Sequence, residues 1–492
     1  MSTRHSFCVI LSVSILLGLF SSAAAQPGPV MSSQEGDEMK EWNHRIRREK
    51  FDLVLPEVMR AHHVDMWIHV MREAISDPFG AEDLGSTSGV FVFTDRGGDR
   101  IERAVLGRRW GASHRGQVDW ETKLVEECGA YDIIFDPVRV QQLPASPMTE
   151  YDYRFKGLRE FVVSRNPKCI AVNYMHDLGP YVTFRGSQGN RRDGLSHTDY
   201  VLLTEVLGDK YANRLVSSEY VMMDYTTRPV PTEIKLLKKM RKDEAEYVKK
   251  VFSEIKPGVT KTRELGETGD EEVDVVVFRR MSTGESQRGR SKSWENSVAQ
   301  GGDIVAAPSQ GMYAYVLREG ETEPPQEIKK LWAEYLKIDK ILAHTIKAGL
   351  TAHEIIQIYK RKFADEGIIV RDDELHMVRP KNNFPVFSEG FDPEKTQLSL
   401  CCHGMVKGAR KRKTENYLAP NVGTFGNSTW AWDIPLPTNH HFVLEYFFYM
   451  PSPTSNKDED QYLLFWDHEQ AIATEKGVEY LSPPQKELYL IK

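Results

Sequence analysis

The residues best suited to chemistry lie within the stretch 383–479. It contains the run Leu400–His403, the apolar run Phe442–Glu445 and a polar run that begins at His468. A carboxylate at the end of an apolar, strand-like run is costly to bury unless it is paired or binds a cation. Glu445 is therefore predicted to have a partner, which the rest of the chain must bring close to it.

The length and composition are those of a globular protein. With 492 residues, of which 40% are hydrophobic and 27% charged, the chain is long enough for two or three domains, each with its own core. The 71 acidic residues outnumber the 64 basic ones, and no basic stripe with interleaved aromatic residues occurs. This balance argues against a nucleic-acid partner.

The amino-terminal segment has the three-part layout of a secretory signal peptide. Arg4 precedes the apolar run Phe7–Phe20, and Ala23–Ala25 supplies small residues for cleavage. An apolar run this short, followed at once by a cleavage site, fits a membrane anchor poorly. We predict a signal peptide over residues 1–25, a flexible leader over 26–42 and export to the periplasm or the outside, with no membrane attachment after cleavage.

Between residues 43 and 230 the sequence alternates between helical and strand-like patterns. Apolar residues at helical spacing predict a helix over Phe51–His62, and the apolar run Val64–Val70 predicts a buried strand. Further short strands are predicted at Gly89–Thr94, Asp132–Phe135 and Cys169–Val172. This alternation is typical of a layered α/β domain.

A second domain is predicted to follow. The α/β pattern breaks at Arg228–Pro231, and a long charged helix begins at Thr232, which places the boundary near residue 230. Thr351 and Glu354 have the spacing of a capping box, which predicts a helix start. We therefore assign residues 231–492 to the second domain.

Short motifs in both halves of the chain resemble those of one known family. In the first half they are Met66–Ile68, Phe91–Gly98 and Asp193–His197. In the second half they are Ile255–Thr260, Gly302–Ile304, Tyr315–Gly320, Pro435–Asn439 and Gly477–Leu481. Together they resemble the creatinase/prolidase/Xaa-Pro aminopeptidase family of pita-bread metallopeptidases, from about residue 45 to the end. The resemblance implies a mixed α/β (α+β) fold, with a creatinase-like α/β domain over 43–230 and a pita-bread metallopeptidase-like domain over 231–492.

The resemblance also implies a metal site. Members of the family hold a pair of divalent ions, such as Mn, Co or Zn, with two Asp, one His and two Glu. In this chain His403 stands at the position of the ligand His and Glu445 at that of the first Glu, while His468 replaces the second Glu. Arg410 stands where the family has a further His that assists the reaction.

Both ligand aspartates are missing. Pro308 or Ser309 occupies the place of an Asp, and no Asp occurs between Asp303 and Asp339. A site without both aspartates has too little negative charge to hold two dications. Whether the chain is an enzyme therefore stays uncertain, although the family consists of hydrolases.

Three interpretations remain. In the first, the chain is an exported pseudoenzyme, inactive or weakly active, which binds a peptide or a protein. In the second, His403, Glu445 and His468 form a changed, mononuclear site that suits a single zinc ion and keeps aminopeptidase activity. In the third, the family function is intact, and a deletion near 304–312 and an insertion near 407–420 reflect an incorrectly assembled reading frame.

The resemblance suggests peptides with proline in second position as substrates and a homodimer as the assembly. The plain alternative to a metal site is that His403 is an ordinary core histidine and that His468 is hydrogen-bonded to the backbone of a strand. Sequence distance alone does not decide whether His403, Glu445 and His468 converge.

Overall fold

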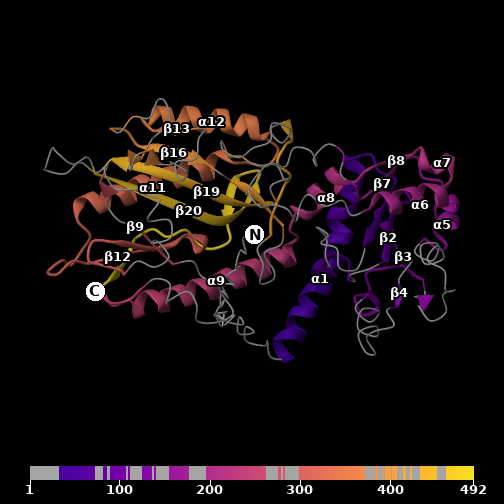
Figure 1. The fold of residues 1–492 in the computed structure, drawn as a ribbon, viewed down its shortest axis with the longest axis horizontal. Helices are drawn as coiled ribbons and strands as arrows, with labels where there is room; N and C mark the ends of the chain where they lie inside the picture. The colour runs from indigo at the N-terminus through magenta and orange to yellow at the C-terminus, as the bar shows by residue number, and fades with distance from the viewer. Residues whose placement is uncertain are drawn as a thin grey trace, which may run out of the picture.

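The computed structural model describes two lobes that lie side by side (Figure 1). The described residues are 33–71, 81–85, 89–106, 109–110, 125–135, 138–139, 155–174, 176, 195–261, 275–278, 281–282, 298–371, 380–381, 384–385, 392, 394–400, 402–406, 414–416, 422–423, 433–451 and 461–492. The predicted signal peptide over 1–25 and Arg410 lie outside these residues. Within them, no helix is both long enough and apolar enough to cross a membrane.

The first lobe is built on a six-stranded sheet. Its strand order is β5 (Ile133–Ile134), β3 (Ile101–Leu106), β2 (Gly89–Asp95), β1 (Met66–Met71), β7 (Ile170–Val172) and β8 (Leu215–Ser217). The strands predicted from the sequence at these places are confirmed, although the one near residue 133 is shorter than predicted.

Helices cover both faces of this sheet. Alternate residues of β1 point to opposite sides, so that Trp67 packs with α1 (Ser33–Ala61) and α8 (Glu219–Thr226), while Ile68 packs with α5 (Leu158–Arg165) and α6 (His197–Leu207). Two short helices, α2 (Ala81–Leu84) and α7 (Asp209–Ala212), complete the lobe. The predicted layered α/β arrangement is confirmed.

Helix α1 corrects one prediction. It begins at Ser33, so the part of the expected flexible leader from residue 33 to 42 is helical instead. The reason lies in tertiary packing, because Met39 and Trp42 pack against the same hydrophobic cluster as the buried Phe51. Two apolar residues in a charged segment are a weak signal in the sequence, but they are enough to dock the first turns of a helix.

The second lobe contains a large sheet and a smaller one. The strands of the eight-stranded sheet are β10 (Met281–Ser282), β20 (Gln461–Thr474), β19 (His440–Pro451), β16 (Gln397–Leu400) and β13 (Ile369–Arg371) in that order, with β17 (His403–Val406), β18 (Thr414–Asn416) and β21 (Gly477–Tyr480) attached beside them. The four-stranded sheet has the order β22 (Tyr489–Ile491), β12 (Met312–Val316), β11 (Ile304–Ala307) and β9 (Val276–Phe278). Two strand pairs stand apart from these sheets: β14 (Pro380–Lys381) with β15 (Phe384–Pro385), and, in the first lobe, β4 (Arg109–Trp110) with β6 (Val138–Arg139) (Figure 1).

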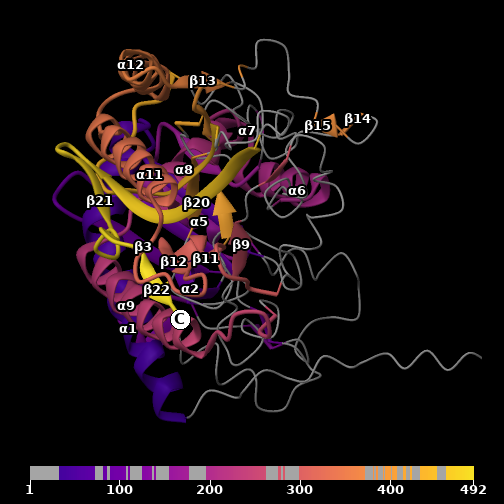
Figure 2. The same cartoon turned by 90° about the vertical axis from the view of Figure 1, so that its left-hand side faces the viewer.

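Helices α11 (Gln326–Thr345) and α12 (Ala352–Asp365) cover one face of the large sheet (Figure 1). Leu444, Tyr446 and Phe448 of β19 belong to the hydrophobic core beneath these helices. Residues alternate along a strand, so Glu445 points to the other face. Figure 2 shows β20 as a long curved strand, with α11 and α12 together on one side of it.

The helix predictions for this lobe are confirmed. Helix α9 spans Pro231–Glu254 and packs its buried Val251 against the four-stranded sheet. Helix α12 starts with the predicted capping box, in which the Glu354 backbone N donates to Thr351 Oγ1 at 3.2 Å and the Thr351 backbone N donates to Glu354 Oε2 at 2.8 Å.

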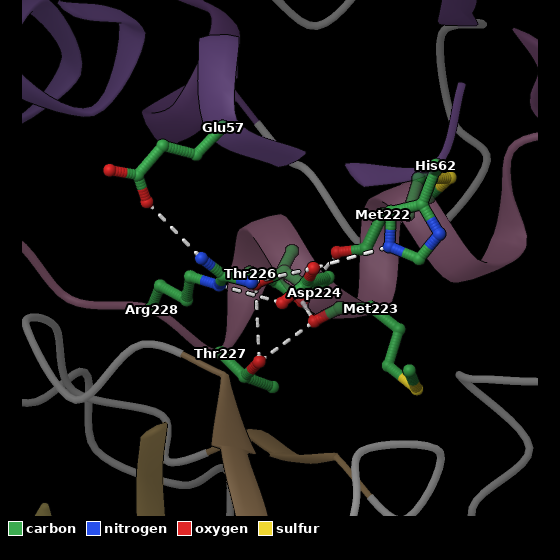
Figure 3. A network of polar contacts seen from close by, with 8 residues as sticks. All are labelled: Glu57, His62, Met222, Met223, Asp224, Thr226, Thr227 and Arg228. Carbon is green, nitrogen blue, oxygen red and sulfur yellow. Dashed lines mark hydrogen bonds and ion pairs between the residues drawn. The ribbon is translucent and has the colours of Figure 1, made fainter. Parts of the chain in front are cut away.

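A polar network lies where the two lobes meet (Figure 3). Asp224 accepts hydrogen bonds from Arg228 Nε at 2.7 Å and lies 3.2 Å from His62 Nε2. Burial acts to raise the pKa of Asp224, but the hydrogen bond with His62 and the charge of Arg228 outweigh it and hold the pKa below its ordinary value. Three residues after Asp224, the carbonyl oxygen of Thr227 accepts a hydrogen bond of 2.9 Å from the backbone N of His441, the second residue of β19. The predicted domain boundary near residue 230 falls beside this junction and stays a prediction.

Candidate metal centre

Three strands bring His403, Glu445 and His468 to one place. Glu445 of β19 pairs directly with His468 of β20, and His403 of β17 pairs with Val443 of β19. Val443 and Glu445 are two residues apart and therefore share a face. The nearest ligand atoms of the three side chains all lie within 4.8 Å of one another, and we call them the His403–Glu445–His468 cluster.

The geometry of the cluster suits cation binding. His403 Nε2 lies 3.5 Å from Glu445 Oε2, and the ring centroids of His403 and His468 are 5.7 Å apart. His403 is 1% exposed, and its Nδ1 lies 3.3 Å from the carbonyl oxygen of Gly404. A proton on Nδ1 directed at that carbonyl leaves the Nε2 lone pair on the side of Glu445, which is the tautomer a metal ligand needs.

The donor set fits one ion better than two. Two imidazoles and one carboxylate are ligands that Zn²⁺ prefers, and three protein ligands leave a fourth position open, as in catalytic zinc sites. A single carboxylate offsets only half of one dication's charge, so a second dication has no counter-charge here. Among the residues that the structure describes, no other group of three His, Cys, Asp or Glu side chains meets the same distance limit.

The acids beside His468 do not join the cluster. Asp467 is buried and accepts a hydrogen bond from the Tyr313 hydroxyl, and Glu469 lies against Gly311. Both side chains are on the face opposite His468, as the strand alternation predicts. Burial is the main cause that raises the pKa of both carboxyl groups well above the ordinary range.

The positions at which the family resemblance predicts an Asp form a tight turn. Pro308 and Ser309 belong to the short 3-10 helix η5 (Pro308–Gln310), which joins β11 directly to β12. The Ser309 carbonyl accepts a hydrogen bond from Arg241 Nη1 at 2.8 Å. Asp303, the nearest acid before the turn, accepts from the backbone N of Gln300 and so closes a different turn. Neither Pro308 nor Ser309 supplies a metal-binding group.

His441 lies on the same face of β19 as Glu445 but stays outside the cluster. His441 is fully buried and its Nε2 lies 3.3 Å from Gln470 Oε1, across the β19–β20 pair. Burial, followed by the nearby charge of Arg241, lowers the pKa of His441 to about 3. This imidazole is therefore neutral, and its contact with Gln470 links β19 to β20.

Trp466 is a neighbour of the cluster that was not predicted from the sequence. Its Nε1 donates to Glu445 Oε1 at 3.3 Å, and its ring centroid lies 5.6 Å from that of His468. The signal that could have identified it is its place two residues before His468, on the same face of the same strand.

Comparisons with known proteins bear on the fold. No model of a known protein family matches the sequence, and no curated protein matches it. An X-Pro aminopeptidase from Thermotoga maritima MSB8 is 13% identical, with 88% of this chain and 100% of that one covered and a TM-score of 0.47. A Xaa-Pro dipeptidase from Bacillus anthracis is 14% identical, with 91% of this chain and 99% of that one covered and a TM-score of 0.46. A prolidase from Pyrococcus horikoshii OT3 is 15% identical, with 92% of this chain and 99% of that one covered and a TM-score of 0.43. All three structures are less than 25% identical to this chain, with TM-scores below 0.5.

Proposed function

We propose that this protein binds one divalent cation, zinc in preference to manganese or cobalt, through the His403–Glu445–His468 cluster. The observation that carries the proposal is the convergence of the three side chains within 4.8 Å from three different strands. Their donor set of two imidazoles and one carboxylate supports zinc, because imidazole nitrogen suits Zn²⁺, whereas Mn²⁺, Mg²⁺ and Ca²⁺ prefer oxygen ligands. Three protein ligands with one open position are also the usual arrangement of catalytic zinc.

The residues of the cluster have separate roles in this proposal. His403 and His468 offer neutral nitrogen donors, and Glu445 supplies the negative charge. When bound, such a cation supplies Lewis acidity toward a carbonyl oxygen and makes a bound water more acidic. The open fourth position is where a peptide carbonyl would bind.

Peptides are the proposed ligands, and peptides with proline in second position are the first to test. The support comes from the sequence motifs that resemble Xaa-Pro aminopeptidases. Turnover is expected to be slow, because Glu445 is the single carboxylate that β19 and β20 direct to this face, and it is already occupied as a ligand. Peptide binding with weak hydrolysis therefore fits the site better than the activity of a dinuclear aminopeptidase.

Export and a homodimer are part of the proposal as well. Export is supported by the signal-like sequence over residues 1–25, with Arg4 before an apolar run and small residues at its end. The dimer is supported by the family resemblance alone.

The test is the metal content of the purified exported protein. After dialysis against trace Zn, Mn and Co, elemental mass spectrometry is expected to find about one ion per chain, mostly zinc. His468→Ala should lose this ion, while His353→Ala, at an exposed histidine of α12, should retain it. Two ions per chain, or none in a folded protein, would contradict the proposal, and none would favour a metal-free peptide-binding pseudoenzyme. A screen of Xaa-Pro peptides against the loaded protein then measures turnover.

A further inference from the structure

The two oxygens of the Glu445 carboxylate face different partners. Oε2 is 3.5 Å from His403 Nε2, on the side of the cluster, whereas Oε1 is 3.3 Å from the indole Nε1 of Trp466. An indole nitrogen is a donor only, so this contact is a hydrogen bond from Trp466 to Glu445. The indole thus binds one carboxylate oxygen, while the other is directed at His403.

Trp466 is itself held in place by packing. It lies directly opposite Phe447 in the β19–β20 pair, and the two rings are stacked at 4° with centroids 5.8 Å apart. The indole also packs against the hydrophobic core of the second lobe. A large aromatic side chain with two constrained torsions moves little once it is stacked in this way.

We propose that Trp466 is a positioning residue for metal binding, which fixes Glu445 as a ligand through Oε2 alone. The inference rests on the proposed metal site. The neutral indole N–H binds Oε1 and leaves the negative charge of the Glu445 carboxylate in place. An arginine or lysine at the position of Trp466 would neutralise that charge. Hydrogen bonds to the outer side of a metal ligand orient it and tune its affinity.

Binding of Glu445 through one oxygen affects the space that is left for a peptide at the ion. With one oxygen from Glu445 and one nitrogen from each histidine, the protein contributes three donor atoms, and a fourth position stays open for a peptide carbonyl. If Glu445 bound through both oxygens, it would occupy part of that space. Trp466 therefore acts on the capacity to bind peptide as well as on metal affinity.

Two substitutions separate the hydrogen bond from the ring. Trp466→Phe removes the N–H but keeps an aromatic ring to stack on Phe447, whereas Trp466→Gln keeps a neutral N–H donor and loses the ring. In a zinc titration against a competing chelator, Trp466→Phe is expected to bind roughly 10- to 100-fold more weakly than the wild type. Trp466→Gln is expected to bind close to the wild type.

Cobalt provides a readout that a purely structural role would not change. Co²⁺ in the wild type should give the strong visible absorption of a four-coordinate ion. In Trp466→Phe, Glu445 is free to bind through both oxygens, which raises the coordination number and weakens that absorption. The melting temperature of the metal-free variants serves as the control for folding.

The indole also reports metal binding by itself. Ni²⁺ or Co²⁺ at the cluster should quench the emission of Trp466, whose ring centroid lies 5.6 Å from that of His468. Trp466→Phe should lose the quenched component. Trp332→Phe, which removes an indole on α11 that donates to the Lys486 carbonyl, should keep it.

The outcomes distinguish the two proposals. A folded wild type that binds no ion overturns the metal site, and this inference with it. Equal zinc affinity and equal cobalt spectra in the wild type and Trp466→Phe overturn the inference and leave the metal site standing. X-ray absorption on the zinc-loaded wild type tests the inference without a variant, since a bidentate carboxylate would contradict it and a single Zn–O distance of about 2.0 Å would support it.

Discussion

Glu445 and His468 lie directly opposite each other in the antiparallel pair of β19 and β20. This register determines what the site can bind. A slip by one residue would bring Asp467 or Glu469 opposite Glu445, and two like charges would then face each other. The observed register instead keeps Asp467 and Glu469 on the helix-covered face and sets an imidazole beside the carboxylate.

Removal of the Glu445 charge is expected to abolish tight metal binding. Glu445→Gln keeps the size of the side chain and its ability to accept a hydrogen bond from Trp466, but it loses the anionic ligand. Zinc affinity should therefore fall roughly 100-fold or more, which is a larger loss than that expected for a residue that only hydrogen-bonds to a ligand. Isothermal titration with Zn²⁺ measures the change. Glu469→Gln, one residue from His468 but on the other face, should leave the affinity unchanged. Unchanged binding by Glu445→Gln would show that the carboxylate is not a ligand.

The cluster could be predicted from the sequence only in part. The positions of His403, Glu445 and His468 followed from a resemblance of motifs, but their convergence depends on how β17, β19 and β20 pair. No local pattern contains that information, because the three residues are separated by long segments of chain. The hydrogen bond from Trp466 to Glu445 depends in addition on a side-chain rotamer, which the sequence does not reveal.

The fold was more accessible from the sequence than the site. Apolar runs such as Val64–Val70 and the capping box of Thr351 and Glu354 act locally, so the sequence predicts β1 and the start of α12. The start of α1 depends on contacts with a distant core, so the polar sequence around Met39 and Trp42 suggested a leader instead. Local signals are reliable where they coincide with tertiary packing, and they fail where packing alone decides.

A buried acid in the second lobe makes stability depend on pH. Asp339 of α11 is almost fully buried and accepts a hydrogen bond from the Tyr480 hydroxyl. Burial raises the pKa of Asp339 from 3.8 to about 6, although the bond from Tyr480 and the charge of His344 oppose the rise. The buried Asp467 and Glu469 are close enough to interact electrostatically with Asp339. Burial also raises the pKa values of these two carboxyl groups well above their ordinary values.

The substitution Asp339→Asn is expected to stabilise the protein at neutral pH. The folded protein holds the Asp339 proton more tightly than the unfolded chain, so the contribution to stability is fully present below pH 3.8 and is lost as the pH rises through about 6. The shift from 3.8 to about 6 corresponds to about 3 kcal/mol at pH 7.5. Asn carries no charge and can still accept from Tyr480. Its advantage should appear in melting curves at pH 7.5 and vanish at pH 4, and an advantage of equal size at both values would refute the explanation.

As a control for that experiment, Asp365→Asn replaces an exposed acid at the end of α12. Its effect on the melting temperature should be small at both pH values, since an exposed carboxyl group is solvated in the folded and unfolded states alike.

The turn between β11 and β12 depends on glycine. Gly311 has a φ of +62°, and a Cβ placed there would lie 2.6 Å from Glu469 Oε2. Gly311→Ala should therefore lower the free energy of unfolding by about 1 kcal/mol for the backbone, and by more for the clash. Gly320→Ala is the matched control, because Gly320 has a φ of +83° and no atom within 4 Å of the added Cβ. Equal losses in urea unfolding would mean that the contact with Glu469 is unimportant.

A buried ion pair between α1 and α9 is expected to stabilise the contact between the lobes. Lys50 Nζ lies 3.9 Å from Glu233 Oε2, with side-chain exposures of 2% and 5%, and 4.7 Å from the ring centroid of Tyr225. Lys50→Met leaves the Glu233 carboxylate buried without this partner, which should lower the free energy of unfolding by about 3 to 5 kcal/mol.

The double variant Lys50→Met with Glu233→Leu tests whether that loss comes from an uncompensated charge. It should recover most of the stability, because apolar side chains of similar size often replace a buried ion pair without cost. Lys239→Met, which breaks an exposed pair with Asp243 on the same helix, should change the melting temperature little. If the double variant is as unstable as Lys50→Met, the lysine acts through its packing on Tyr225, and the ion pair contributes nothing to the junction of the lobes.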